Sequence, residues 1–163
     1  MERYGRRAWL GFALAAGGTV ASAGRRATPA SAATAMRVWR DPGCGCCGGW
    51  VEHMRAEGFA VQDTVTRDVS AARRALGTPP DLLSCHAASV EGYALEGHVP
   101  AAAVRRLLAE RPPGVRGLAV PAMPIGTPGM EVEGREPDTY DVIAFGAGDQ
   151  RRSFMRFVGA RPA

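Results

Sequence analysis

The sequence predicts an α/β domain in which helices flank a central mixed β-sheet. Short apolar segments alternate with helical patterns after residue 35, and a pair of strand-like segments closes the chain. A length of 163 residues allows one domain of ordinary size. Hydrophobic residues make up 46% of the chain, which is enough for a packed core. We therefore expect a single folded domain over residues 36–163.

Residues 1–35 have the three parts of an export signal. A charged start ends at Arg6-Arg7, an apolar run covers residues 8–21, and small residues offer cleavage sites at 21–23 and 33–35. The paired arginines resemble the twin-arginine signal, whose pathway carries folded proteins. An uncleaved anchor is the alternative, but the apolar run is shorter than the roughly 20 residues of a membrane span. We expect a cleaved signal, a periplasmic location and no membrane span in the mature chain.

The net charge of +4 comes from this same segment. It holds five of the 20 basic residues, all of them Arg, and one of the 16 acidic residues, which leaves 15 of each in the remainder. A nucleic-acid-binding surface needs clustered positive charge, whereas the remainder has only scattered pairs of arginines. The sequence therefore argues against a nucleic-acid partner.

The first half of the domain is predicted to run strand, helix, strand, helix. Residues 36–40 form a short strand, which Asp41-Pro42-Gly43 interrupts. Apolar residues recur at helical spacing over residues 48–58, and residues 59–65 suggest a second strand. Residues 69–76 form a short helix that a glycine and two prolines end.

A hairpin and a third helix follow. Residues 87–90 and 93–95 bracket Glu91-Gly92, which favours a hairpin. Pro100 suits the first turn of a helix, which ends before residues 112–114. The order β-α-β-α-β-β-α, with cysteines between the first strand and the first helix, is the layout of a thioredoxin-like domain.

The last part of the chain extends this layout. Residues 114–139 hold nine Gly or Pro residues and show no clear period, so we expect a long ordered loop. Residues 140–145 and 153–158 then form a final pair of strands, joined through residues 146–149. The expected fold is thioredoxin-like with a C-terminal loop and β-hairpin extension.

Three thiols lie within four residues, at Cys44, Cys46 and Cys47. At the start of a helix, free backbone N–H groups and the helix dipole stabilise a thiolate. The surrounding glycines leave room for the backbone to approach a metal or a disulfide closely. The cluster therefore predicts a soft-metal site or a redox site.

Three interpretations of the cluster compete. Thiolates are soft ligands that suit copper(I), and closely spaced sulfurs can bridge several ions. Alternatively, Cys44 and Cys47 have the C-x-x-C spacing of a redox disulfide, with Cys46 as an extra thiol. The third interpretation is a structural disulfide of an exported protein, which would need Cys85. A zinc knuckle is disfavoured because no second C-x-x-C pair follows.

Other side chains with soft or borderline donors lie further along the chain. In a thioredoxin-like domain the loop before the third strand packs against the cysteine turn, which would bring Cys85 and His86 to Cys44–Cys47. His98 ends a predicted strand, from which its imidazole could either reach the same site or serve only as a cap or surface residue. Met123 and Met130 lie in a loop rich in Pro and Gly and add thioethers, although methionines are also ordinary core residues. His53, about two helical turns beyond Cys46, is expected to face solvent.

Several motifs together resemble the CopG-type family of small periplasmic metal-binding proteins, long catalogued as a domain of unknown function and found with copper-resistance genes. The motifs are Gly43–Trp50, Ser84–His86, Gly92-Tyr93 with Glu96–Pro100, and Leu118–Met130. They occur in the same order and span about residues 36–158. Thr127 stands where the family usually has Ser, and Ala87 where it often has Thr.

This resemblance implies a thioredoxin-like fold that binds copper through the C-x-C-C turn. The candidate ligands that it implies are Cys44, Cys46, Cys47, Cys85 and His86 or His98. The resulting hypothesis is a periplasmic copper-binding protein of copper resistance or homeostasis, in which thiolates hold Cu(I) and imidazole lets the site tolerate Cu(II). The alternatives are a thiol–disulfide oxidoreductase that uses Cys44 and Cys47, and a module that delivers copper to another periplasmic copper-handling protein.

Overall fold

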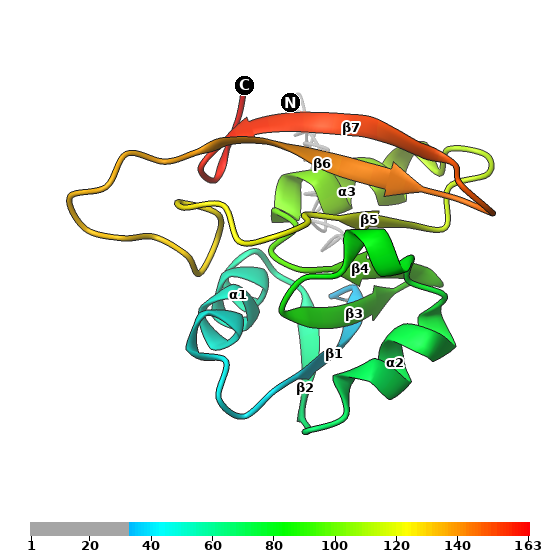
Figure 1. The fold of residues 1–163 in the computed structure, drawn as a ribbon, viewed down its shortest axis with the longest axis horizontal. Coiled ribbons are helices and arrows are strands. Elements are labelled where there is room, and N and C mark those ends of the chain that lie inside the picture. Colours follow the sequence, from blue (N-terminus) through cyan, green and yellow to red (C-terminus); the bar gives the residue numbers. More distant parts are fainter. Residues whose placement is uncertain (1–32) are drawn as a thin grey trace, which may run out of the picture. The chain divides into compact units, whose positions relative to one another are not determined.

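The computed structural model describes residues 33–163 (Figure 1). In chain order the elements are β1 (Ala35–Arg40), α1 (Gly45–Ala56), β2 (Ala60–Val65), α2 (Val69–Leu76), the 3-10 helix η1 (Pro80–Leu82), β3 (His86–Val90), β4 (Tyr93–Glu96), α3 (Ala101–Glu110), β5 (Gly117–Ala119), β6 (Thr139–Phe145), β7 (Arg151–Val158) and β8 (Arg161–Pro162).

All the strands join one mixed sheet, in the order β2-β1-β3-β4-β5-β6-β7-β8. The pairs β1–β2 and β4–β5 are parallel, and the remaining neighbours are antiparallel. The predicted α/β class with a mixed sheet and flanking helices is therefore confirmed. The first seven regular elements follow the predicted order β-α-β-α-β-β-α, which is compatible with a thioredoxin-like layout.

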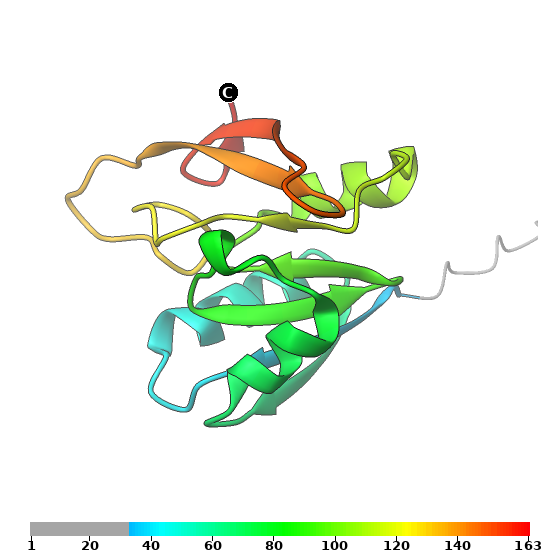
Figure 2. The ribbon, with the colours of Figure 1, turned by 45° about the vertical axis from the view of Figure 1, so that its right-hand side comes forward.

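The helices cover both faces of the sheet (Figures 1 and 2). Trp50, Val51 and Met54 of α1 share the main hydrophobic core with Val104 and Leu107 of α3. The second, smaller core contains Leu82 of η1, with Leu76 of α2 packed against it. The apolar residues that recur at helical spacing in the sequence thus lie on the side of each helix that packs against the strands.

Two predicted boundaries change in a way that matters for the site. Helix α1 begins at Gly45, before the predicted residue 48, so Cys46 and Cys47 lie in its first turn. The expected loop over residues 114–139 contains strand β5, which pairs with both β4 and β6. Through β5, the C-terminal strands β6 and β7 continue the main sheet.

A long loop, residues 120–138, leaves β5 and returns to β6 with isolated turns only. In Figure 1 it is the yellow to orange segment that passes beside α1. Gly129 of this loop lies so close to α1 that a Cβ built on Gly49 would be 2.9 Å from the Gly129 Cα. The loop is therefore fixed against the cysteine-bearing end of α1.

Most of the predicted export signal, residues 1–32, lies outside the described residues. The second candidate cleavage site, residues 33–35, falls on the start of β1, where the Thr34 carbonyl accepts a hydrogen bond from the Ala60 amide. Among the described helices, none has the length and apolar character needed to cross a membrane.

Candidate metal centre

A tight turn presents the cysteines at the start of α1. The Asp41 carboxylate accepts a hydrogen bond from the Gly43 amide at 2.8 Å, and the Asp41 carbonyl accepts one from the Cys44 amide at 3.1 Å. Cys44 is the N-cap of α1 and its φ of −88° is extended. Cys46 and Cys47 follow in the first turn of the helix.

Cys44 and Cys47 are joined by a disulfide, with their Cα atoms 5.4 Å apart. Cys46 is a free thiol whose Sγ lies 3.5 Å from the Cys44 Sγ, and Cys85 is the other free thiol of the described residues. The two cysteines with C-x-x-C spacing therefore form the disulfide that redox chemistry would use, and Cys46 and Cys85 take no part in it.

The ends of β3 and β4 bring the second group of donors to this turn. Cys85 precedes β3, His86 opens it, and His98 follows β4 by two residues. The Cys85 Sγ lies 3.0 Å from the His98 Nε2 and 3.4 Å from the His86 Nδ1. Both imidazoles are fully buried and Cys85 is half-buried.

These side chains form two overlapping groups of four potential metal ligands. One group consists of Cys44, Cys46, Cys47 and Cys85, and the other of Cys47, Cys85, His86 and His98. Within each group all the donor atoms lie within 4.8 Å of one another. Cys47 and Cys85 belong to both groups, so the six side chains make one continuous site.

Burial keeps both histidines neutral near pH 7. Desolvation lowers the pKa of His86 well below its usual value, and the His98 ring and two nearby arginines lower it further. Desolvation also lowers the pKa of His98. Because a metal binds the lone pair of a neutral imidazole, this environment keeps both rings ready to act as ligands.

Burial has the opposite effect on the Cys85 thiol. Desolvation, followed by the nearby Cys46 thiol, raises the pKa of Cys85 to about 11. Without a metal, Cys85 is therefore a neutral thiol near pH 7. A bound cation would remove its proton, as metal coordination does for thiols in general.

The loop fixes which nitrogen of His98 faces the thiols. The His98 Nδ1 lies 2.7 Å from the carbonyl oxygen of Pro128. A carbonyl only accepts hydrogen bonds, so Nδ1 carries the proton and Nε2 presents its lone pair to Cys85. This is the arrangement by which an outer hydrogen bond orients a metal-binding histidine.

Trp50 of α1 supports the other imidazole. Its ring centroid lies 4.4 Å from that of His86, and the His86 ring in turn meets the His98 ring edge-on at 5.1 Å. The Trp50 Nε1 donates a hydrogen bond of 2.9 Å to the Val99 carbonyl. The His86 Nε2 is buried with no hydrogen-bond partner among the described residues, and its Nδ1 faces Cys85.

The two predicted thioethers lie on the loop that covers this site. Met123 is 52% exposed, while Met130 is half-buried and bonds through its backbone to Thr127 and Gly126. His53 differs from expectation, because it is half-buried and its Nε2 accepts a hydrogen bond of 3.4 Å from the Ala101 amide. The prediction that His53 faces solvent is therefore wrong.

Sequence reasoning missed two charged residues next to the site. Glu96 ends β4 with no exposed surface and forms a bidentate ion pair with Arg73 of α2. The sequence does contain one sign of the role of Glu96, which is an acidic residue at the end of an apolar strand, immediately before Gly97-His98. Its partner Arg73 lies 23 residues earlier and gave no comparable signal.

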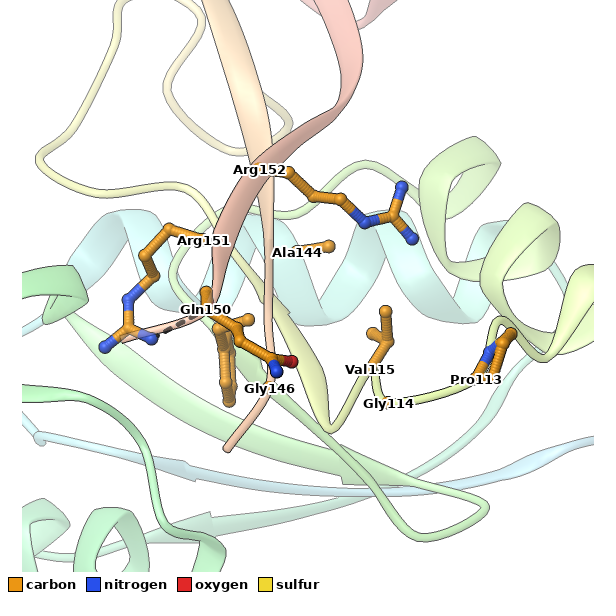
Figure 3. A pocket seen from close by; sticks show the side chains of 9 residues that line it. Pro113, Gly114, Val115, Ala144, Gly146, Gln150, Arg151 and Arg152 are labelled. Carbon is orange, nitrogen blue, oxygen red and sulfur yellow. Dashed lines mark hydrogen bonds between the residues drawn. The ribbon is translucent and has the colours of Figure 1, made fainter. Parts of the chain in front are cut away.

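A separate cavity of about 290 Å³ lies near the β6–β7 turn (Figure 3). Its lining contains no cysteine, histidine or methionine. The lining residues are Pro113, Gly114, Val115, Ala144, Phe145, Gly146, Gln150, Arg151 and Arg152. The thiols and the imidazoles of His86 and His98 therefore take no part in this cavity.

Comparisons with known proteins agree with this site. Residues 82–130 match a family model described as a protein of unknown function, DUF411. No curated protein matches the chain. Two solved structures, described as copper resistance protein CopG in Form 1 and Form 2, are each 40% identical to it with a TM-score of 0.71. The match covers 78% of this chain and 99% of the Form 1 chain, and 77% and 98% for Form 2.

The match spans nearly the whole of both solved chains, and the residues that match the family model include Cys85, His86 and His98. The chain therefore belongs to the CopG-type copper resistance family.

Proposed function

We propose that this protein binds copper(I) in the periplasm through its cysteine cluster and contributes to copper resistance. The observation that carries the proposal is the convergence of four cysteine sulfurs within 4.8 Å. Thiolates are soft ligands that prefer copper(I), zinc or iron–sulfur clusters. Two structures described as copper resistance proteins share the fold at 40% identity, which favours copper among these.

The donor set suits copper in both of its common states. When the Cys44–Cys47 disulfide is reduced, four sulfurs and two neutral imidazoles become available. When it is formed, Cys46, Cys85, His86 and His98 remain as donors. Imidazole is a good ligand for copper(II), so this second set lets the site tolerate the oxidised ion.

The overlap of the two donor groups favours more than one bound ion. Cys47 and Cys85 belong to both groups, and thiolate sulfur can bridge neighbouring soft ions. Met123 and Met130 are proposed as additional thioether ligands from the covering loop. Met123 is exposed, and Met130 is half-buried and directly follows Gly129, which contacts the first turns of α1.

Export supports the same function. The Cys44–Cys47 disulfide is compatible with an oxidising compartment, and residues 1–35 have the pattern of a cleaved signal. Cleavage after residue 23 would leave β1 complete, whereas cleavage after residue 35 would remove its first residue, Ala35. The proposed partners are copper ions and other periplasmic copper-handling proteins, to which a delivery role would transfer the ion.

The second candidate function is a thiol–disulfide oxidoreductase, and the Cys44–Cys47 disulfide is the observation that favours it. In such an enzyme a thiolate of the reduced pair would attack a substrate disulfide, and the pair would be reoxidised to its own disulfide. The free thiols Cys46 and Cys85 would then be dispensable. A copper site, in contrast, needs both of them.

A pair of variants separates the two functions. We expect Cys46→Ser and Cys85→Ser each to weaken copper(I) binding by at least about tenfold in competition with a calibrated chelator, because each removes a sulfur ligand. Asp141→Asn, which breaks an exposed ion pair on β6 and β7, is the control and should bind like the parent protein. Unchanged copper binding in both cysteine variants, with retained turnover of a disulfide substrate, would overturn the copper proposal in favour of the oxidoreductase.

A further inference from the structure

Three donors of the metal centre come from two short segments at one end of the β3–β4 hairpin. Cys85 and His86 lie in the segment 84–86, and His98 lies in the segment 96–98. The Gly97 amide donates a hydrogen bond of 2.9 Å to the His86 carbonyl, which joins the segments through their backbones. This bond does not by itself fix the orientation of the Cys85 side chain relative to the two imidazoles.

A buried ion pair holds the residue immediately before Cys85. The Glu96 carboxylate accepts hydrogen bonds from the Arg73 Nε at 3.1 Å and Nη2 at 2.7 Å. The same carboxylate accepts a third bond from the Ser84 amide at 2.8 Å, and the Arg73 Nη2 also donates to the Ser84 carbonyl at 2.6 Å. Both backbone polar groups of Ser84 are thus held, one by each member of the pair.

Close packing at Gly97 and Ser84 also holds the segments together. Gly97 has a φ of +70°, and a Cβ at this position would lie 2.6 Å from the Ser84 Oγ and from the Val120 carbonyl oxygen. The Ser84 hydroxyl donates a hydrogen bond of 2.6 Å to the Ala122 carbonyl and lies 3.9 Å from the Cys85 Sγ. Segments 84–86, 96–98 and 120–122 therefore touch at Ser84.

A requirement for stability alone would not explain this ion pair. Glu96 is fully buried and the Arg73 side chain is 18% exposed, so both charges have lost most of their water. Desolvation of that kind offsets the attraction between the charges, and well-packed apolar residues of similar size are often as stabilising. The bidentate geometry of an arginine and a carboxylate instead defines one orientation, which an apolar contact would not.

We propose that Arg73 and Glu96 are positioning residues of the metal centre, which hold Ser84 so that the Cys85 sulfur stays between the two imidazoles and the cysteine turn. This inference rests on the proposed copper site, because it assigns a purpose to the geometry of that site. Neither residue is proposed to touch the metal. They act through the Ser84 backbone, as outer hydrogen bonds do in metal sites generally.

The test uses two variants that change the pair in different ways. Glu96→Gln keeps the size of the side chain but removes its charge, and Arg73→Lys keeps the charge but loses the two-pronged donor. Asp141→Asn again serves as the control, because it breaks the ion pair with Arg156 on β6 and β7. The alkylation rate of Cys85 in the reduced, metal-free protein is measured by mass spectrometry, together with copper(I) affinity against a chelator.

We expect both variants to alkylate Cys85 at least about tenfold faster than the parent, because a half-buried thiol that is no longer held in place opens more often to the reagent. Their copper(I) affinity should fall by about 10- to 100-fold. The control should change neither quantity. If Glu96→Gln does not fold, Arg73→Lys alone decides the matter, because it retains a buried charge for Glu96.

The outcomes distinguish failure of this proposal from failure of the copper function. If the parent protein itself binds no copper(I), the proposed function is wrong, and the alkylation rates still report on the positioning role. If the parent binds copper(I) while a folded Arg73→Lys protein shows the parental alkylation rate and affinity, the positioning role is overturned.

Discussion

Cys85 is the residue at which the two halves of the metal centre meet. Its sulfur lies 3.0 Å from the His98 Nε2 and belongs both to the group of four cysteines and to the mixed cysteine–histidine group. Cys47 shares this double membership, but in the structure its sulfur is occupied by the disulfide to Cys44. Cys85 is thus the shared sulfur that remains free in either redox state of the pair.

At Gly129 the backbone of the loop over residues 120–138 lies very close to the first turns of α1. The φ of Gly129 is +85°, and a Cβ would lie 2.5 Å from the Trp50 amide nitrogen and 2.6 Å from the Cys46 carbonyl oxygen. Only glycine allows the loop to lie this close to the first turns of α1. The Pro128 carbonyl that orients His98 is the neighbouring group, so the contact also serves the imidazole.

Gly129→Ala is therefore expected to destabilise the protein more than a change of backbone preference alone would. Gly134→Ala is the matched control, because Gly134 also has a positive φ, of +73°, but a Cβ there meets nothing within 4 Å. We expect an additional loss of roughly 2 kcal/mol in the free energy of unfolding for Gly129→Ala, from the added steric clash. Denaturant unfolding of both variants measures the difference, and equal losses would contradict the proposed contact.

At the scale of elements, helix α1 both presents the thiols and supports the imidazoles. Its first turn carries Cys46 and Cys47, and one turn later Trp50 packs on His86 and donates a hydrogen bond to Val99. Val99 directly follows His98 in the chain. One helix thus connects the cysteine turn to both histidines.

The hydrogen bond from Trp50 gives a prediction for this element. Trp50→Phe should lower the free energy of unfolding by about 1–3 kcal/mol, because it leaves the buried Val99 carbonyl without its donor. Trp39→Phe on β1 is the control, since Trp39 is only half-buried, and its effect should stay near 0.5 kcal/mol. Thermal or denaturant unfolding provides the measurement. A Trp50→Phe protein as stable as the control would mean that the Val99 carbonyl is satisfied in another way.

The sequence predicted the elements whose signals are local and missed those that depend on distant partners. Helical spacing and the Glu91-Gly92 turn correctly indicated α1 and the β3–β4 hairpin. Strand β5 has only three residues, and its strand character comes from pairing with β4 and β6 rather than from its own sequence. The start of α1 was placed too late because Gly45 and Gly48 are poor helix formers, which tertiary contacts override.

The same distinction applies to the site. Cysteine and histidine are recognisable as potential metal ligands from residue type alone, so all six thiol and imidazole candidates could be named from the sequence. The structure brings their donor atoms together. The hydrogen bond between the Pro128 carbonyl and His98 could not be predicted, because every residue has a backbone carbonyl and the residue type does not show which one will be used. Arg73 is one of many arginines, and only the fold distinguishes it by placing it against Glu96.

At the scale of the whole molecule, the buried histidines couple folding to pH. The pKa of His86 and that of His98 are both lowered in the folded protein, so the unfolded chain binds more protons as pH falls. The histidine contribution to stability is thus present above about pH 6.5, the value for an unfolded chain, and is lost as pH falls below it. Glu96, whose pKa burial raises, opposes this trend in the acidic range.

We therefore expect the free energy of unfolding of the reduced, metal-free protein to decrease from pH 7 to pH 5. The slope should approach about 1.4 kcal/mol per pH unit for each buried histidine. His86→Phe removes one of these groups and should make the slope shallower. Urea unfolding at a series of pH values measures both proteins, and a flat profile for the parent would contradict the buried neutral imidazoles.

In the proposed site, copper is held mainly by sulfur, with imidazole nitrogen as the second donor type. X-ray absorption at the copper edge, on the purified protein with its metal content determined, reports both the metal and the ratio of sulfur to nitrogen ligands. We expect bound copper with predominantly sulfur neighbours and a smaller contribution from nitrogen. Protein that contains no copper, or copper surrounded only by nitrogen and oxygen, would contradict it.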